Sequence, residues 1–162
     1  MLTPKNIIYG FCKITNPPKK KYFISLYRSE LLHVVACFTT SQDRSGAPLG
    51  QSRHGANRNS NDDIVSYVFK ANVEIGDIPG SSDKFKFPCE TVIRFDYGLK
   101  DREQDEIMGW FQEPKVVGIL SDKEYENLLY AMVKSDDVPK KYQILFDEVL
   151  QELGRKRCGS NK

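Results

Sequence analysis

The sequence predicts an α+β fold, in which a small antiparallel β-barrel is followed by two packed helices at the C-terminal end. Up to residue 119, short runs rich in β-branched and aromatic residues alternate with Gly, Pro and Asn, as in strands joined by turns. Beyond residue 120, apolar residues recur at helical spacing instead. The chain has 162 residues, of which 40% are hydrophobic, and this is enough for a single domain with a real core.

Three strands are expected near the N-terminus. The first covers residues 6–14 and is ended by the Asn-Pro-Pro of residues 16–18, because proline cannot donate a hydrogen bond to a sheet. Residues 22–27 form the second strand, and residues 32–38 form a third that is apolar enough to be central. The short turn at Ser29-Glu30 predicts that the last two strands pair as an antiparallel hairpin.

Residues 43–63 are predicted to be the least structured stretch. They contain almost no large apolar side chains, so they cannot fill a core, and a loop of this length is either functional or disordered. Four more strands are expected after it, at residues 64–71, 85–87, 91–95 and 115–119. Residues 101–105 are predicted to be a charged connection.

Two helices are predicted to close the chain. The first begins at Ser121 with the capping box Ser-Asp-Lys-Glu, in which the Ser hydroxyl accepts from the backbone amide of Glu124. The Glu124 side chain is expected to reach back to the amide of Ser121. The second helix begins near Pro139, which the first turn of a helix tolerates, and is predicted to stop at Gly154.

Organisation and composition exclude several classes of protein. We expect one domain over residues 1–154 and a frayed polar tail over residues 155–162. No apolar run approaches the roughly 18 residues that span a membrane. The N-terminus lacks the plan of a signal peptide, so a cytoplasmic protein without membrane contact is expected. The four cysteines form no Cys-x-x-Cys pair and there are only two histidines, which argues against a zinc ribbon or a histidine-rich metal site.

The charge is distributed unevenly along the chain. Residues 1–60 hold nine Lys/Arg and two Asp/Glu, a net charge of +7, whereas residues 61–162 hold fifteen and twenty, a net charge of −5. A basic half favours a polyanionic partner, and nucleic acid is the most common one. Alternatively, the two halves fold together and partly neutralise each other.

Three segments in order along the chain carry a family resemblance. In residues 21–26 a basic residue precedes an apolar strand, and in residues 36–42 an apolar strand ends in Thr-Thr-Ser-Gln. Residues 117–124, continuing to Met132, combine a closing strand with a capped helix. Together these segments resemble the PemK/MazF-like family, the toxins of many bacterial toxin–antitoxin pairs.

The resemblance implies an SH3-like β-barrel, a homodimer, and a metal-independent endoribonuclease that cleaves single-stranded RNA. It also implies that no cofactor is used and that an antitoxin protein neutralises the enzyme. The family's catalytic pair is a basic residue before the second strand and a threonine at the exit of the next, which correspond to Lys21 and Thr39. A lysine thus stands in place of the family's arginine and offers a point charge rather than a planar fork.

Further side chains are suited to binding RNA. Amines, guanidinium groups, hydroxyls, an amide and an imidazole are candidates for contacts to phosphates and bases: Lys19, Lys20, Thr40, Gln42, Arg44, Arg53, His54 and Arg58. His54 is also a candidate acid or base, because imidazole titrates near neutral pH. Tyr22, Tyr27 or Tyr67 is a candidate to stack on an unpaired base.

Two rival functions are open on the sequence alone. One is a non-catalytic SH3-like module that binds RNA or a protein partner. The other is a toxin directed at DNA or gyrase on a related barrel. The basic loop over residues 43–63 also has an alternative to binding RNA, as a disordered segment that binds an antitoxin or another partner.

Overall fold

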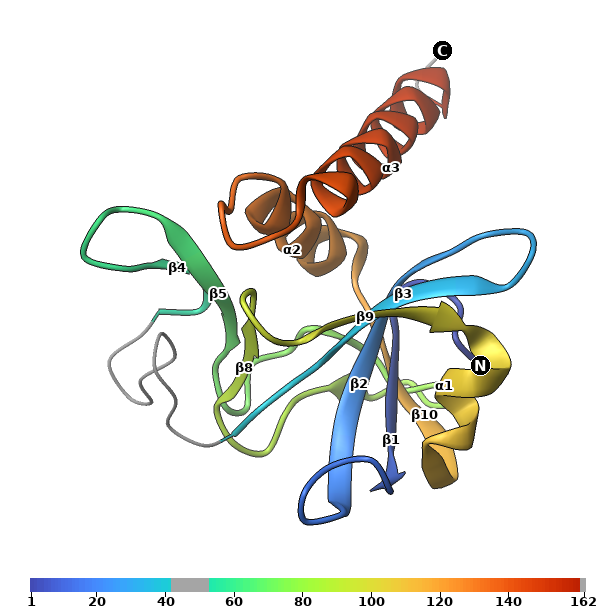
Figure 1. Ribbon diagram of the computed structural model, residues 1–162. Helices are drawn as coiled ribbons and strands as arrows, with labels where there is room; N and C mark the ends of the chain where they lie inside the picture. The colour runs from blue at the N-terminus through green and yellow to red at the C-terminus, as the bar shows by residue number, and fades with distance from the viewer. Residues whose placement is uncertain (42–52, 161–162) are drawn as a thin grey trace.

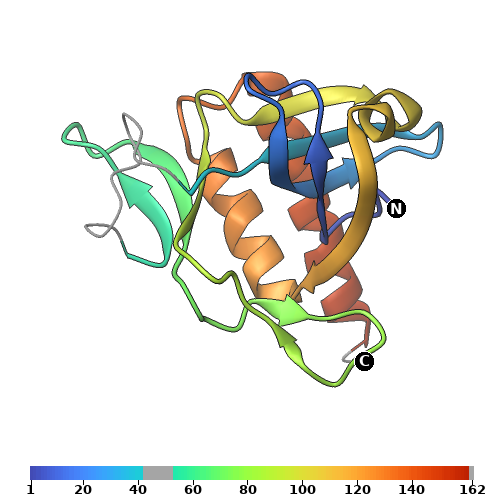
Figure 2. The same ribbon diagram turned by 90° about the horizontal axis from the view of Figure 1, so that it is seen from below.

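The computed structural model describes residues 1–41 and 53–160, which form two sheets and three helices (Figures 1 and 2). The larger sheet has, in order, β7 (Lys84–Phe85), β6 (Gly76–Asp77), β10 (Phe111–Leu120), β1 (Asn6–Cys12), β2 (Lys19–Arg28), β3 (His33–Phe38) and β9 (Leu99–Glu103). The smaller sheet has β4 (Gly55–Arg58), β5 (Ile64–Phe69) and β8 (Thr91–Arg94). The helices are α1 (Gln104–Gly109), α2 (Asp122–Val133) and α3 (Lys140–Ser160).

All the strand pairs of these sheets are antiparallel, so the predicted α+β fold with two C-terminal helices is confirmed. The described strands form two open sheets, and no closed barrel is found among them. Beyond the end of β3, the backbone amide and carbonyl of Thr40 exchange two hydrogen bonds of 2.8 Å with those of Val92 in β8. The path of β3 therefore links the larger sheet to the smaller one.

Helices cover both faces of the larger sheet (Figure 1). Successive side chains of a strand point to opposite faces, so Phe23 packs with Ile107 of α1, while Ile24 belongs to the main core with Leu128 of α2. All four of these side chains are fully buried. This double cover explains why β2 and β3 are continuous apolar runs rather than alternating ones.

Three predictions of local structure are wrong. Residues 101–105, expected to be a connection, contribute the end of β9 and the start of α1. β9 is the last strand of its sheet and its side chains are half-buried or exposed, so it carries no apolar alternation. Helix α3 does not stop at Gly154 but continues to Ser160, and part of the expected loop forms β4.

The predicted capping box is half right. The Ser121 hydroxyl accepts a hydrogen bond of 3.2 Å from the backbone amide of Glu124, as expected for the first residue before α2. The amide of Ser121, however, donates to the carbonyl of Ile75 at 2.9 Å. This leaves the Glu124 carboxylate for partners on another element: it accepts from the Tyr67 hydroxyl at 2.6 Å and contacts the imidazole of His54 at 2.8 Å.

Candidate functional site

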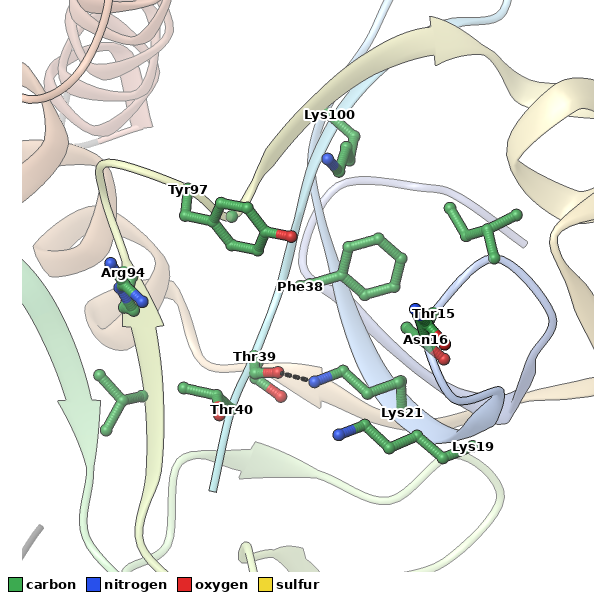
Figure 3. Close-up of a pocket in the computed structure, with 13 residues that line it drawn as sticks. Thr15, Asn16, Lys19, Lys21, Phe38, Thr39, Thr40, Arg94, Tyr97 and Lys100 are labelled. Carbon is green, nitrogen blue, oxygen red and sulfur yellow. Dashed lines mark hydrogen bonds between the residues drawn. The ribbon is translucent and has the colours of Figure 1, made fainter. Parts of the chain in front are cut away.

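A cavity of about 340 Å³ lies where β3 leaves the larger sheet and approaches β8 (Figure 3). Its walls come from the connection between β1 and β2, the start of β2, the exit of β3, and from β8, β9 and the turn between them. Among the described residues, four cationic side chains line it: Lys19, Lys21, Arg94 and Lys100. Segments that are far apart in the sequence thus meet at one hollow, beside the threonines that follow β3.

The two residues predicted to be catalytic are in direct contact. The Lys21 ammonium donates a hydrogen bond of 2.6 Å to the backbone carbonyl of Thr39 (Figure 3). Thr39 is 5% exposed, and its own amide donates to the carbonyl of Tyr22 at 3.4 Å. The pairing of β2 with β3 brings these residues together, because it places Phe23 opposite Phe38. Thr40, also a predicted RNA ligand, lies next to them in the lining.

The three consecutive lysines of β2 do not all line the same cavity. Side chains alternate along a strand, so Lys19 and Lys21 face the cavity while Lys20 is not among its lining residues. The Lys20 ammonium instead lies 5.9 Å from the centre of the Tyr9 ring, in a second hollow that Lys115 also lines. The predicted set of RNA ligands is therefore divided between two faces of the sheet.

Two cations of the cavity were not anticipated from the sequence. Arg94 ends β8, and Asp96 holds its guanidinium through two hydrogen bonds of 3.1 and 2.8 Å. Lys100 lies in β9. A signal for Arg94 existed, since an apolar strand ends in Arg-Phe-Asp-Tyr-Gly much as β3 ends in threonines. The sequence holds no such signal for Lys100, because β9 lacks the apolar alternation of a strand.

Three predicted ligands of the basic loop that the structure describes lie elsewhere. Arg53, His54 and Arg58 are not lining residues of the cavity. Arg58 donates to the carbonyl of Asp62 at 2.7 Å, within its own turn. Gln42 and Arg44 lie outside the described residues.

His54 has structural partners on both ring nitrogens. Its Nδ1 accepts from the backbone amide of Lys70 at 3.1 Å, so in the neutral ring Nε2 carries the proton and donates to Glu124. Glu124 also accepts from Tyr67, whose pKa is raised by burial and, less strongly, by this hydrogen bond. The imidazole therefore joins β5, through Lys70 that follows it, to the start of α2.

The tyrosines proposed for stacking are not at the cavity. Tyr67 is 1% exposed, so the prediction that it stacks on a base is wrong. Tyr22 is half-buried between Tyr9 and Phe87, and Tyr27 packs at the edge of the main core. The tyrosine that lines the cavity is Tyr97, which is 74% exposed and was not considered from the sequence.

The cavity has the charge of an anion site. Among its described lining residues there are four cations and no Asp, Glu or His. Such a site can hold phosphate and stabilise developing negative charge, but it offers neither a carboxylate nor an imidazole as a general base. Within the described part of the chain, no group of three or more His, Cys, Asp or Glu is arranged to hold a metal ion.

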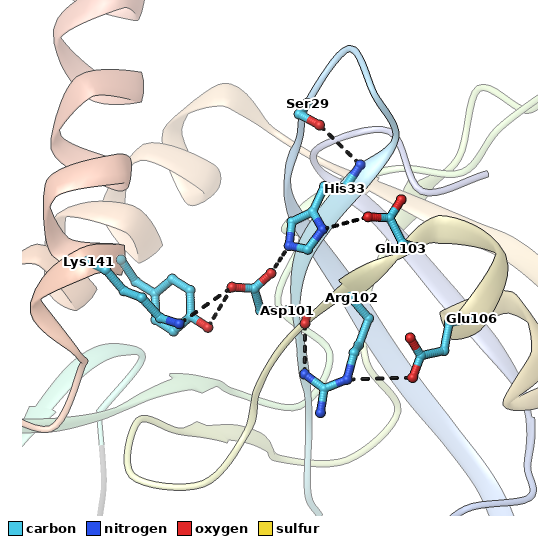
Figure 4. A network of polar contacts seen from close by, with 8 residues as sticks. Ser29, His33, Asp101, Arg102, Glu103, Glu106 and Lys141 are labelled. Carbon is cyan, nitrogen blue, oxygen red and sulfur yellow. Dashed lines mark hydrogen bonds and ion pairs between the residues drawn. The ribbon is translucent and has the colours of Figure 1, made fainter.

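A second polar cluster joins α3 to the larger sheet (Figure 4). The His33 imidazole contacts the carboxylates of Asp101 and, at 3.1 Å, Glu103. Asp101 also accepts from the Tyr142 hydroxyl of α3 at 2.8 Å and lies 3.8 Å from the Lys141 ammonium. Hydrogen bonds to Glu103 and Asp101 raise the pKa of His33. For Asp101, burial alone would raise the pKa, but hydrogen bonds from Tyr142 and His33 outweigh it and the pKa is lowered.

This cluster predicts a pH-dependent contribution to stability. The pKa of His33 is higher in the folded protein than its ordinary value of 6.5, so its contribution is fully present below that value. It is lost as the pH rises through the folded-state pKa. We expect His33→Gln to lower the free energy of unfolding, by about 1 kcal/mol or less because the imidazole is partly exposed, and by more at pH 6 than at pH 9. Urea unfolding at both pH values measures the difference, and an equal loss at both would contradict the assignment.

No protein-family model, curated protein or solved structure matches this chain. Among the described helices, none is long and apolar enough to cross a membrane.

Proposed function

We propose that this protein binds single-stranded RNA in the cavity of Figure 3 and cleaves it there without a metal ion, as a toxin of the PemK/MazF-like type. One observation carries the proposal: four cationic side chains from three strands converge on the exit of β3, with no carboxylate among the described lining residues. Lys and Arg side chains bind the phosphates of nucleic acids, because each contact releases a counterion from the backbone. The family resemblance of the segments around Lys21 and Thr39 supplies the reaction class.

In the proposed reaction, the 2′-hydroxyl of the RNA attacks the adjacent phosphorus and passes its proton to water. The bond from phosphorus to the 5′-oxygen breaks, and this oxygen takes a proton from water, so the products are a 2′,3′-cyclic phosphate and a 5′-hydroxyl. Negative charge grows on the phosphoryl oxygens, and the Lys21 ammonium stabilises it from the cavity wall, where the Thr39 carbonyl holds it at 2.6 Å. The Thr39 hydroxyl donates to the phosphate and orients it. Lys19, Arg94 and Lys100 bind neighbouring phosphates, so the rate gain rests on positioning and charge stabilisation.

The proposal includes an SH3-like barrel, a homodimer and a neutralising antitoxin. The barrel is supported by the antiparallel succession of β10, β1, β2 and β3, and by the bridge from Thr40 to Val92 that connects it to β8. An antitoxin segment rich in carboxylates would pair with the same four cations that bind phosphate. RNA and antitoxin would then compete for the cavity.

Incubation of the purified protein with a long single-stranded RNA in EDTA, read on a sequencing gel, tests the proposal. We expect discrete cuts by the wild type and by Thr39→Ser, which keeps the hydroxyl, and a loss of about 100-fold in rate for Thr39→Ala. Absence of cuts by a folded wild type would contradict the endoribonuclease. Equal cutting by Thr39→Ala would remove the threonine hydroxyl from the mechanism.

A second candidate is an RNA-binding module without turnover, and one observation favours it. The described lining residues include no imidazole or carboxylate to accept the proton of the 2′-hydroxyl. This candidate predicts no cuts but salt-dependent binding, with a slope of log K against log salt of about −3 if the four cations each contact one phosphate of a single strand.

A further inference from the structure

We infer that Tyr97 is a stacking platform on which one unpaired base of the RNA lies, while the cavity's cations hold the flanking phosphates. The inference rests on the proposed function and adds a subsite for the base. The Tyr97 side chain lines the cavity and is 74% exposed, whereas Tyr67 is buried and Tyr22 is half-buried against the main core. A large aromatic face left in water beside an anion site is suited to a ligand that is both flat and anionic.

The turn that carries Tyr97 is held against β3. The amide of Gly98 donates to the carbonyl of Arg94 at 3.1 Å, and the carbonyl of Gly98 accepts from the amide of Phe38 at 3.0 Å. A Cβ atom at position 98 would lie 3.1 Å from the backbone oxygens of both Arg94 and Phe38, so glycine permits this close approach. The backbone that carries the ring is thereby held at the edge of the cavity before any ligand arrives, which lowers the entropy cost of binding.

Cations flank the ring. The guanidinium carbon of Arg94 lies 5.8 Å from the centre of the Tyr97 ring, and the Lys100 ammonium lies 5.6 Å from it. Asp96 holds the guanidinium in place through two hydrogen bonds. If a base stacks on Tyr97, Arg94 and Lys100 would therefore lie close enough to bind the phosphates on either side of its sugar.

A second aromatic side chain, Phe38, also lines the cavity. Figure 3 shows the hydroxyl end of Tyr97 pointing toward Phe38, and both residues line the cavity. Phe38 is itself held by Trp110, at 6.3 Å between ring centroids, and by Phe23 at 4.8 Å. An inorganic anion would use the cations but neither of these rings, so two aromatic side chains in the lining favour a nucleotide over a simple anion.

The test measures binding of a fluorescein-labelled single-stranded RNA hexamer by anisotropy, in EDTA and at several salt concentrations. The hexamer carries 2′-O-methyl groups, so that it has no 2′-hydroxyl to attack the phosphate and is not cleaved during the measurement. We expect Tyr97→Leu to weaken binding by about 5- to 100-fold, the range for removing one base–aromatic stack. Tyr97→Phe keeps the face of the ring and should bind like the wild type. The salt slope should not change in Tyr97→Leu, because no phosphate contact is removed.

Hexamers that each lack one base complete the experiment. At one position, loss of the base should weaken the wild type and Tyr97→Phe but leave Tyr97→Leu unaffected. Equal binding by Tyr97→Leu and wild type, or equal weakening by Tyr97→Phe and Tyr97→Leu, would overturn the stacking platform and leave the proposed function standing. A folded wild type that binds no hexamer would overturn both.

Discussion

Replacing Lys21 by methionine is expected to lower the rate of RNA cleavage by about 100- to 1,000-fold, the effect of removing one donor that stabilises transition-state charge. The Lys21 ammonium is the cation that contacts Thr39, and its position is set by the carbonyl at 2.6 Å. Methionine keeps a long apolar side chain against β2, so packing changes little while the charge is lost. Single-turnover cleavage of a saturating single-stranded RNA measures the effect on the chemical step rather than on binding.

Two matched variants separate chemistry from charge. Lys20→Met removes the same charge one residue away, but from the opposite face of the strand, so a much smaller loss is expected. Lys21→Arg keeps a cation and introduces the residue found in the family that these segments resemble, so it should retain most of the activity. If Lys20→Met and Lys21→Met slowed cleavage equally, the effect would be one of net charge. Lys21 would then have no specific role in stabilising the transition state.

Gly76→Ala is expected to lower the free energy of unfolding by about 2–4 kcal/mol, because the interior cannot accommodate the added methyl group. A Cβ at Gly76 would lie 1.9 Å from the backbone oxygen of Ile119 and 2.8 Å from its carbonyl carbon. These are main-chain atoms of β10, which no side-chain rotation can move away. The variant must therefore shift or break the pairing of β6 with β10, and urea unfolding followed by circular dichroism would show the loss.

Gly154→Ala is the matched control with the opposite sign. Gly154 lies inside α3 and a Cβ there meets nothing within 4 Å, so alanine should stabilise the protein by about 0.5–1 kcal/mol. If Gly76→Ala were as stable as the wild type, the close approach of β6 to β10 would not exist in solution. If Gly154→Ala were destabilising, the helix would not continue through this position.

The predicted elements that the structure confirms are those with strong apolar periodicity. The runs around residues 22–27 and 32–38 and the stripes of the two C-terminal helices are buried, and burial is what their patterns predict. The strand at residues 99–103 and the short helix after it are polar and were missed. Their places are set by pairing with β3 and by one buried side chain, Ile107, which leave little local pattern.

Glu124 shows how tertiary contacts redirect a correct local signal. The motif at Ser121 predicts the start of α2 correctly, but the backbone amide that Glu124 was expected to satisfy is taken by the carbonyl of Ile75. The carboxylate then serves the Tyr67 hydroxyl and the His54 imidazole. The same contacts hold the His54 imidazole on the α2 side of β5, and His54 does not line the cavity.

The chain's local pattern was enough to predict the antiparallel strands and the capped helix. The family resemblance singled out Lys21 and Thr39 as a pair, and the contact between them is a finding of the structure. The local pattern could not indicate that Arg94, Tyr97 and Lys100 join them, or that Lys20 does not. Periodicity reports which side chains are buried, and that is a property of a residue and its near neighbours. Which exposed side chains share a cavity depends instead on the register between distant strands and on the face to which each residue points.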